Sequence, residues 1–97
     1  MIEPSTKIER NERAVYRELT DGAGVVLNLD TSNYHGVNAT GAVLWELTES
    51  SPTFGELVTT ASGRFENAPT ALDDDVEEFV LALVERDLLH LTPPDGA

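Results

Sequence analysis

The side chains that could carry catalytic or metal chemistry are few in this sequence and do not gather along the chain. The two histidines, His35 and His90, stand alone, without the close spacing that brings two imidazoles to one metal ion. Glu77 and Glu78 are neighbours, but adjacent side chains on a helix point about 100° apart, so these carboxylates do not converge for acid–base catalysis. The chain has no cysteine and no glycine-rich phosphate loop, and a nucleophile-elbow context is missing around every serine: Ser5, Ser32, Ser50, Ser51 and Ser62. We therefore expect no enzymatic activity, no cofactor and no metal site.

The charge balance also restricts the choice of partner. Eighteen acidic residues against six basic ones give a formal net charge of −12. Such a surface repels a phosphate backbone, so we do not expect a nucleic acid to bind. The excess is concentrated in residues 66–87, where a single base, Arg86, stands among eight acids: Glu66, Asp73, Asp74, Asp75, Glu77, Glu78, Glu85 and Asp87.

The length of the chain predicts one domain, because 97 residues support a single modest core. We expect this domain to span residues 13–91, between a flexible N-terminal segment (1–12) and a flexible C-terminal tail (92–97). No apolar run reaches the ~20 residues of a membrane span, and the first ten residues are too polar for a secretory signal. We therefore expect a cytoplasmic protein without a membrane span.

Three strands are predicted in the first half of the chain. Residues 13–19 and the β-branched run at 24–30 flank Asp21-Gly22, a pair that suits the positive φ angles of a tight hairpin turn. Residues 34–37 follow a turn-rich quartet and alternate as a third short strand. Together these runs predict an antiparallel, three-stranded meander.

Three helices are predicted after the strands. Asn38 suits the N-cap of the first, which ends near residues 50–52. Thr53 and Glu56 have the spacing of a capping box for the second helix, and Thr70 and Asp73 repeat that spacing for the third. The third helix has the clearest apolar stripe, formed by Leu72, Val76, Phe79, Val80 and Leu83.

The order of these elements predicts an α+β fold, with a three-stranded antiparallel sheet followed by three helices. The third strand lies at an edge of that sheet, where its outer backbone groups have no partner. Gly36 adds no bulk or charge there that would block an approaching chain. An edge of this kind can accept another strand.

Several short runs, taken in their order and spacing, carry a family resemblance. They are Val-Val-Leu-Asn-Leu-Asp at 25–30, Tyr-His-Gly-Val-Asn-Ala-Thr-Gly at 34–41, Leu-Trp-Glu-Leu at 44–47, and in the third helix Asp75-Val76, Phe79-Val80, Leu83 and Asp87-Leu88-Leu89. Over roughly residues 14–91 the chain thus resembles the PqqD-like family, named for a protein of pyrroloquinoline quinone biosynthesis. Asp87 stands where this family often has glycine, and Asp can adopt the left-handed conformation of a helix C-cap at some cost.

The resemblance implies a winged helix-turn-helix-like domain that recognises ribosomally made, modified peptides. In such a domain the leader of the precursor peptide lies as an added strand against the third strand, in a groove beside the third helix, and partner enzymes act on the core peptide. A short, separate chain is most similar to the recognition proteins of lasso-peptide clusters, where a leader peptidase and a cyclase are separate chains. The alternative is a winged-helix nucleic-acid-binding or transcriptional accessory protein, which the acidic third helix disfavours.

Two groups of residues are predicted to contact the leader. The first is the third strand with the cap that follows it, Tyr34, His35, Gly36, Val37 and Asn38. Within the strand, His35 and Val37 share one face, with Val37 expected in the core, and Tyr34 and Gly36 share the other. The second group lies on one flank of the third helix: Asp75, Glu78, Phe79, Ala82 and Arg86. The alternative for Phe79 is ordinary core packing, and for the two acids it is a solvated face or favourable interaction with the helix dipole.

Overall fold

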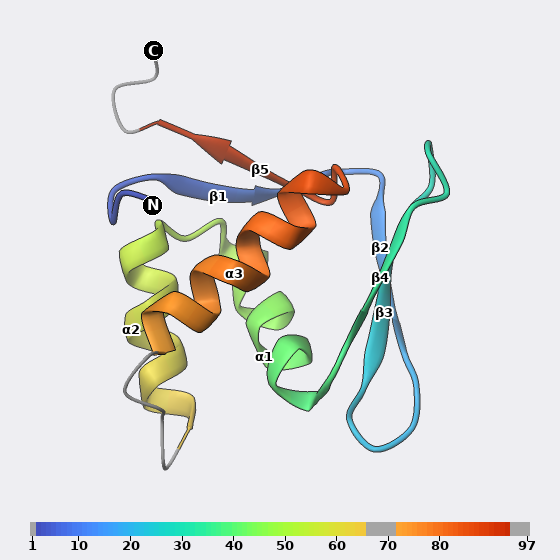
Figure 1. The fold of residues 1–97 in the computed structure, drawn as a ribbon, viewed down its shortest axis with the longest axis horizontal. Coiled ribbons are helices and arrows are strands. Elements are labelled where there is room, and N and C mark those ends of the chain that lie inside the picture. The colour runs from blue at the N-terminus through green and yellow to red at the C-terminus, as the bar shows by residue number, and fades with distance from the viewer. Residues whose placement is uncertain (1, 66–71, 94–97) are drawn as a thin grey trace.

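The structure, a computed structural model, describes residues 2–65 and 72–93. Figure 1 shows a sheet followed by three helices, as predicted, and two further strands near the ends of the chain. The fold class is α+β, with a winged helix-turn-helix-like order of elements. The elements in chain order are β1 (Lys7–Arg10), β2 (Ala14–Glu18), β3 (Gly24–Asn28), β4 (Tyr34–Val37), α1 (Ala39–Leu47), a 3-10 helix (Thr48–Ser50), α2 (Phe54–Arg64), α3 (Leu72–Glu85) and β5 (Leu89–Thr92).

The three-stranded sheet is the predicted meander, in the order β2-β3-β4. Its hairpin turn contains Asp21 and Gly22, whose φ angles are 60° and 79°. Both residues are therefore in the left-handed region that this pair tolerates, which confirms the turn. Val26 in the central strand is fully buried, because the inner face of the sheet packs against the helices.

Local capping residues set the starts of the first two helices. The Asn38 side-chain oxygen accepts a hydrogen bond from the Gly41 N–H at 2.8 Å, as an N-cap does. Thr53 and Glu56 form the predicted capping box at the start of α2. Thr70, the predicted cap of α3, lies outside the described residues.

A second sheet contradicts the prediction of a flexible segment over residues 1–12. Within that segment β1 pairs antiparallel with β5, in a register that places Lys7 opposite Thr92 and Arg10 opposite Leu89. Ile8 is fully buried, and Ile2 also lies in the core, with its backbone N–H donating to Glu77 Oε1 at 2.8 Å. The prediction was wrong here because β1 carries one apolar residue among charged ones, and its partner strand lies at the other end of the chain. The predicted tail likewise begins too early at Thr92, and its residues 94–97 lie outside the described residues.

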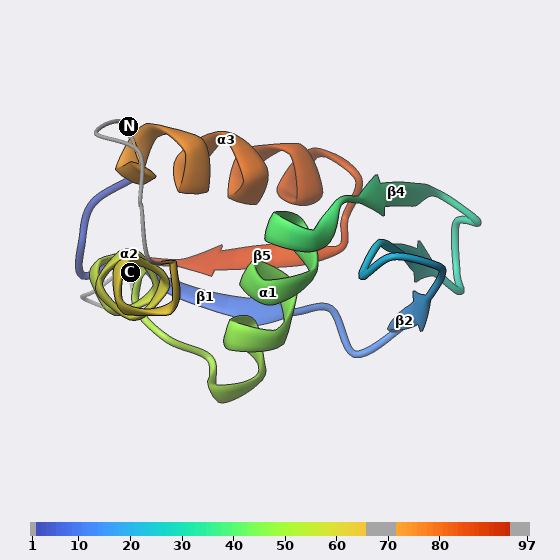
Figure 2. The same cartoon turned by 90° about the horizontal axis from the view of Figure 1, so that it is seen from below.

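The helices and the two-stranded sheet enclose the core. Figure 2 shows α3 running alongside β5 and α1 in front of the β1–β5 pair, with α2 at the end of the molecule away from the three-stranded sheet. Four residues of the predicted α3 stripe are buried: Leu72, Val76, Val80 and Leu83. The fifth, Phe79, is only half-buried.

The C-terminal end of α3 turns on Asp87, which adopts the left-handed conformation with φ of 57°. The Leu88 N–H donates to the Leu83 carbonyl at 2.8 Å, and the Asp87 N–H donates to the Val84 carbonyl at 3.0 Å. These two bonds form the Schellman motif, in which glycine is the usual residue at the left-handed position. Aspartate therefore occupies this position at a conformational cost.

We expect Asp87→Gly to raise the free energy of unfolding by about 0.5–1 kcal/mol, because glycine removes the strain of the left-handed conformation. Asp87→Asn is the matched control, since it removes the same negative charge from the helix C-terminus but keeps a side chain. Urea unfolding followed by circular dichroism measures both variants. A glycine variant no more stable than the asparagine variant would show that the backbone is not strained here.

Candidate functional site

The outer edge of β4 presents unpaired backbone groups. β4 is the last strand of its sheet, paired only with β3 in a register that sets Val26 opposite His35. The Asn28 N–H donates to the Asn33 carbonyl at 2.8 Å. Because hydrogen-bonded pairs alternate in an antiparallel ladder, His35 and Val37 direct their N–H and C=O groups towards β3, and Tyr34 and Gly36 direct theirs outwards. The edge therefore offers two N–H and two C=O groups to an added strand.

A groove of about 330 Å³ lies between this strand and α3. Figures 1 and 2 show β4 and α3 on the same side of the molecule, with α1 beginning between them. The groove is lined by His35, Gly36, Val37, Asn38, Gly41, Asp75, Glu78, Phe79 and Ala82. Two chain segments predicted to act together, some forty residues apart, thus form its two sides.

All the predicted contact residues except Tyr34 and Arg86 line this groove. Tyr34 projects from the other face of the sheet, where it is 68% exposed, so only its backbone faces the edge. Arg86 lies just beyond the groove at the His35 end, and its Nη1 donates to the Ala82 carbonyl at 3.2 Å. The side-chain faces predicted for β4 are confirmed, since Val37 is buried and Gly36 is exposed.

Gly41, which the sequence prediction did not include, also lines the groove. A Cβ atom at this position would lie 3.0 Å from Val37 Cβ and 3.4 Å from Phe79 Cε1. Glycine therefore lets α1 approach both sides of the groove closely. A sequence signal for this role does exist. Gly41 stands three residues after the Asn38 cap, inside a helix, where glycine is unfavourable unless close packing requires it.

A second cavity, of about 490 Å³, continues from the groove over the start of α1. It shares Asn38, Gly41, Asp75 and Phe79 with the groove and adds Thr40, Leu44, Phe65 and Leu72. The half-buried Phe79 ring therefore borders both spaces. The sequence left two interpretations open for Phe79, and the ring satisfies both: it packs against the core and also faces the groove.

The titratable groups of the groove differ between its two ends. Asp75 and Glu78 are exposed on the α3 side. At the other end, burial lowers the pKa of His35, and the positive charge of Arg86 nearby lowers it further. The lowered pKa favours the neutral form of His35 at pH 7, which leaves the Arg86 guanidinium as the positive charge at this end.

Asn28 holds the two sides of the groove together. Its side chain is fully buried at the end of β3, where Nδ2 donates to the Asp87 carbonyl at 2.8 Å and Oδ1 accepts from the Asp30 N–H at 2.8 Å. The amide therefore joins the sheet to the C-terminal end of α3. The Asn11 side chain donates to the same Asp87 carbonyl at 2.7 Å, in a hydrogen bond that is exposed to solvent.

We expect Asn28→Asp to lower the free energy of unfolding at pH 7 by about 2–4 kcal/mol, because a buried carboxylate oxygen would face the Asp87 carbonyl without a proton between them. Asn11→Asp is the matched control, and it should cost less than about 1 kcal/mol because Asn11 is more accessible to water. The deficit at Asn28 should shrink in acid, where the protonated carboxyl can donate. Urea unfolding at pH 7 and pH 5 checks this prediction, and equal costs for the two variants would contradict it.

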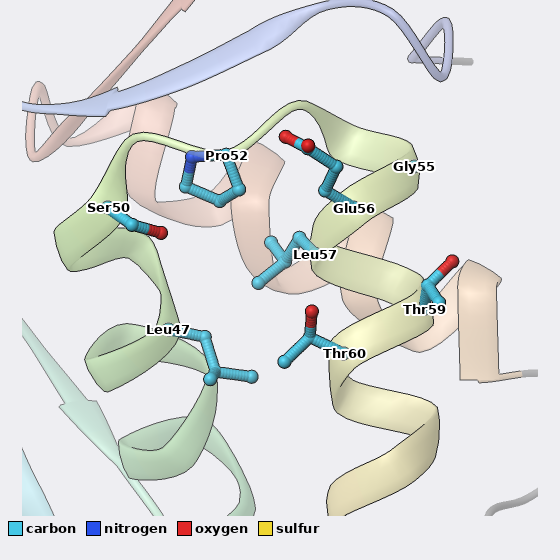
Figure 3. A pocket seen from close by; sticks show the side chains of 8 residues that line it. All are labelled: Leu47, Ser50, Pro52, Gly55, Glu56, Leu57, Thr59 and Thr60. Atoms are coloured by element: carbon cyan, nitrogen blue, oxygen red, sulfur yellow. The ribbon is translucent and has the colours of Figure 1, made fainter.

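A further cavity, of about 660 Å³, lies between α1 and α2 (Figure 3). Leu47, Pro52 and Leu57 give it apolar walls, and Thr59 and Thr60 contribute hydroxyl groups. Its one carboxylate, Glu56, already accepts a hydrogen bond from the Thr53 N–H in the capping box. The lining therefore contains no pair of groups arranged for acid–base or nucleophilic chemistry.

Within residues 2–65 and 72–93, no group of three His, Asp or Glu side chains is placed to hold a metal ion. Among the helices described there, none has the length and apolar character to cross a membrane.

Residues 23–89 match the model of the family described as coenzyme PQQ synthesis protein D (PqqD). The chain belongs to the PqqD family. No curated protein matches it.

Two solved structures share the fold. One, TbiB1 in complex with the TbiA(beta) leader peptide, is 26% identical over 84% of this chain and 94% of that chain, with a TM-score of 0.72. The other, lasso peptide synthetase B1 complexed with the leader peptide, is 17% identical over 86% of this chain and 96% of that chain, with a TM-score of 0.67. The resemblance predicted from the sequence is thus confirmed.

Proposed function

We propose that this protein binds the leader segment of a ribosomally made precursor peptide by adding it as a strand to β4. The observation that carries the proposal is the open edge of β4, whose unpaired groups at Tyr34 and Gly36 lie beside a groove. Strand addition uses such an edge for affinity and the adjoining surface for side-chain specificity. The two similar structures, both of proteins bound to leader peptides, support it.

The bound leader would hold the core peptide for partner enzymes that modify it. Since the two similar structures carry leader peptides and one is a lasso peptide synthetase component, we propose a leader peptidase and a cyclase of lasso-peptide or related biosynthesis as these partners. The protein itself would perform no chemistry, and it would meet its partners in the cytoplasm. The net charge of −12 favours a leader with basic residues over a nucleic acid.

Isothermal titration calorimetry tests this function with the leader and core halves of a candidate precursor, sought among short reading frames near the gene. We expect the leader half to bind one to one and the core half to give no heat of binding. After incubation with this protein alone, both peptides should remain intact and unmodified. Binding of the core half without the leader half would overturn the proposal.

A further inference from the structure

The groove has a direction, because β4 and α3 run in opposite senses along it. Asn28 pairs with Asn33 at the start of β4, and its side chain binds the carbonyl of Asp87 at the C-terminal end of α3. Asp75, in the first turn of α3, lines the same cavity as Asn38 at the other end of β4. The start of β4 therefore faces the end of α3, and the end of β4 faces its start, as Figure 1 also shows.

Opposite charges lie at these two ends. The first turn of α3 is acidic, and Asp75 and Glu78 direct this charge to the groove. Arg86 stands at the far end beside His35, bonded to the carbonyl of the groove residue Ala82. Two acids adjoin Arg86 in the sequence, but the Asp87 carboxylate lies 3.7 Å from His90 Nε2 on β5, and Glu85, one position earlier on the helix, points about 100° away from Arg86.

We propose that the groove selects leaders by the order of their charges, with a basic residue held at the Asp75 and Glu78 end and an acidic residue held at the Arg86 end. This inference rests on the proposed strand addition and adds to it the class of leader that fits. Apolar contacts at Phe79 supply affinity between the two charged ends, and the charges fix direction and register.

The helix sets the spacing of the two leader charges. Arg86 is eight residues beyond Glu78 and eleven beyond Asp75, or about 12 and 16 Å at ~1.5 Å per residue. A strand rising ~3.4 Å per residue covers these lengths in roughly four to five residues. Leader side chains that enter the groove are those opposite His35 and Val37, which recur at every second residue. Four is the even number in this range, so the two charges are four residues apart.

The strand also sets which charge comes first. An antiparallel pair is more stable per residue than a parallel one, so the leader runs from the Asn38 end of β4 towards the Tyr34 end. Its N-terminal part then lies beside Asp75, and its C-terminal part lies beside Arg86. The recognised segment therefore carries lysine or arginine first and aspartate or glutamate after it.

The test is selection of a displayed library of random twelve-residue peptides on the immobilised full chain at low ionic strength. Peptides with the base four residues before the acid should be enriched, by about two- to fivefold for each charge pair. With Arg86→Glu, the enriched peptides should carry a base where the wild-type protein selects the acid. With Asp75→Lys and Glu78→Lys combined, they should carry an acid where the wild-type protein selects the base. Asp74→Lys makes the same kind of change on α3 outside the groove lining, and it should leave the enriched pattern unchanged.

Each result separates this inference from the function on which it rests. Enriched peptides without a charge order, or with the acid before the base, would overturn the proposed selection while leader binding stands. The same holds if Asp74→Lys alters the pattern as strongly as the two groove substitutions. No enrichment of any peptide, together with no calorimetric binding of the precursor's leader half, would overturn the proposed function itself.

Discussion

Replacing Gly36 with proline is expected to weaken leader binding about tenfold or more, while Gly36→Ala binds like the wild type. Proline removes the outward N–H that an added strand would use, and it is tolerated on an edge strand where that N–H faces solvent. The loss of one hydrogen bond and of the local register corresponds to about 1.4 kcal/mol or more. Alanine keeps the N–H, and its Cβ would meet nothing within 4 Å. Calorimetry with the leader peptide measures both variants.

The control for this experiment is His35→Pro. The His35 N–H points inwards to β3, so its loss should lower stability instead of removing a contact with the leader. Circular dichroism establishes which variants are folded. A folded Gly36→Pro variant that binds as tightly as Gly36→Ala would show that strand addition to β4 is wrong.

Replacing Phe79 with alanine is expected to raise the leader dissociation constant by tenfold or more, with little dependence on salt. The ring borders both cavities and is only half-buried, so an apolar leader side chain can contact it. Burying an aromatic ring against an apolar partner contributes about 1.5–3 kcal/mol. The measurement is the dissociation constant at low salt and near 0.5 M, where the Debye length is only a few Å.

The acidic groove residues give the contrasting result. Asp75→Asn and Glu78→Gln should each weaken binding about two- to fivefold at low salt, and the effect should fade as salt rises. Asp74→Asn is the matched control on the same helix turn, outside the groove lining. If Phe79→Ala still folds and binds normally, its ring serves only the core, and the leader does not enter the groove at this point.

The sequence allowed the meander and the helices to be predicted because each has a local signal. Asp21 and Gly22 mark the turn, and Asn38 and Thr53 mark helix starts through side chains that bond to nearby N–H groups. The two sides of the groove were also predictable, since a period of two on β4 and 3.6 on α3 fixes the face of each side chain. These signals depend on residues only a few positions apart.

The rest depends on contacts that no local pattern contains. The β1–β5 pair joins residues at opposite ends of the chain, and Ile8 alone does not make an alternating pattern. Phe65 enters the second cavity through the packing of α2, which periodicity on one helix does not describe. Asn28 is an intermediate case, because Gly24 and Val26 share its buried face, so a polar residue there required a partner. The partner is the backbone of Asp87, which sequence alone does not bring near.

The pairing of β1 with β5 also determines how the domain can be attached to other proteins. Lys7 and Thr92 lie opposite each other in the register, so β1 begins beside the place where β5 ends. Figure 1 shows that this place is at the side of the molecule away from β4. A covalent fusion after β5 therefore leaves the groove uncovered, and a peptidase or cyclase tethered there would have to reach round the domain through its linker. Linker length would then control the effective concentration of the enzyme at the tethered core peptide.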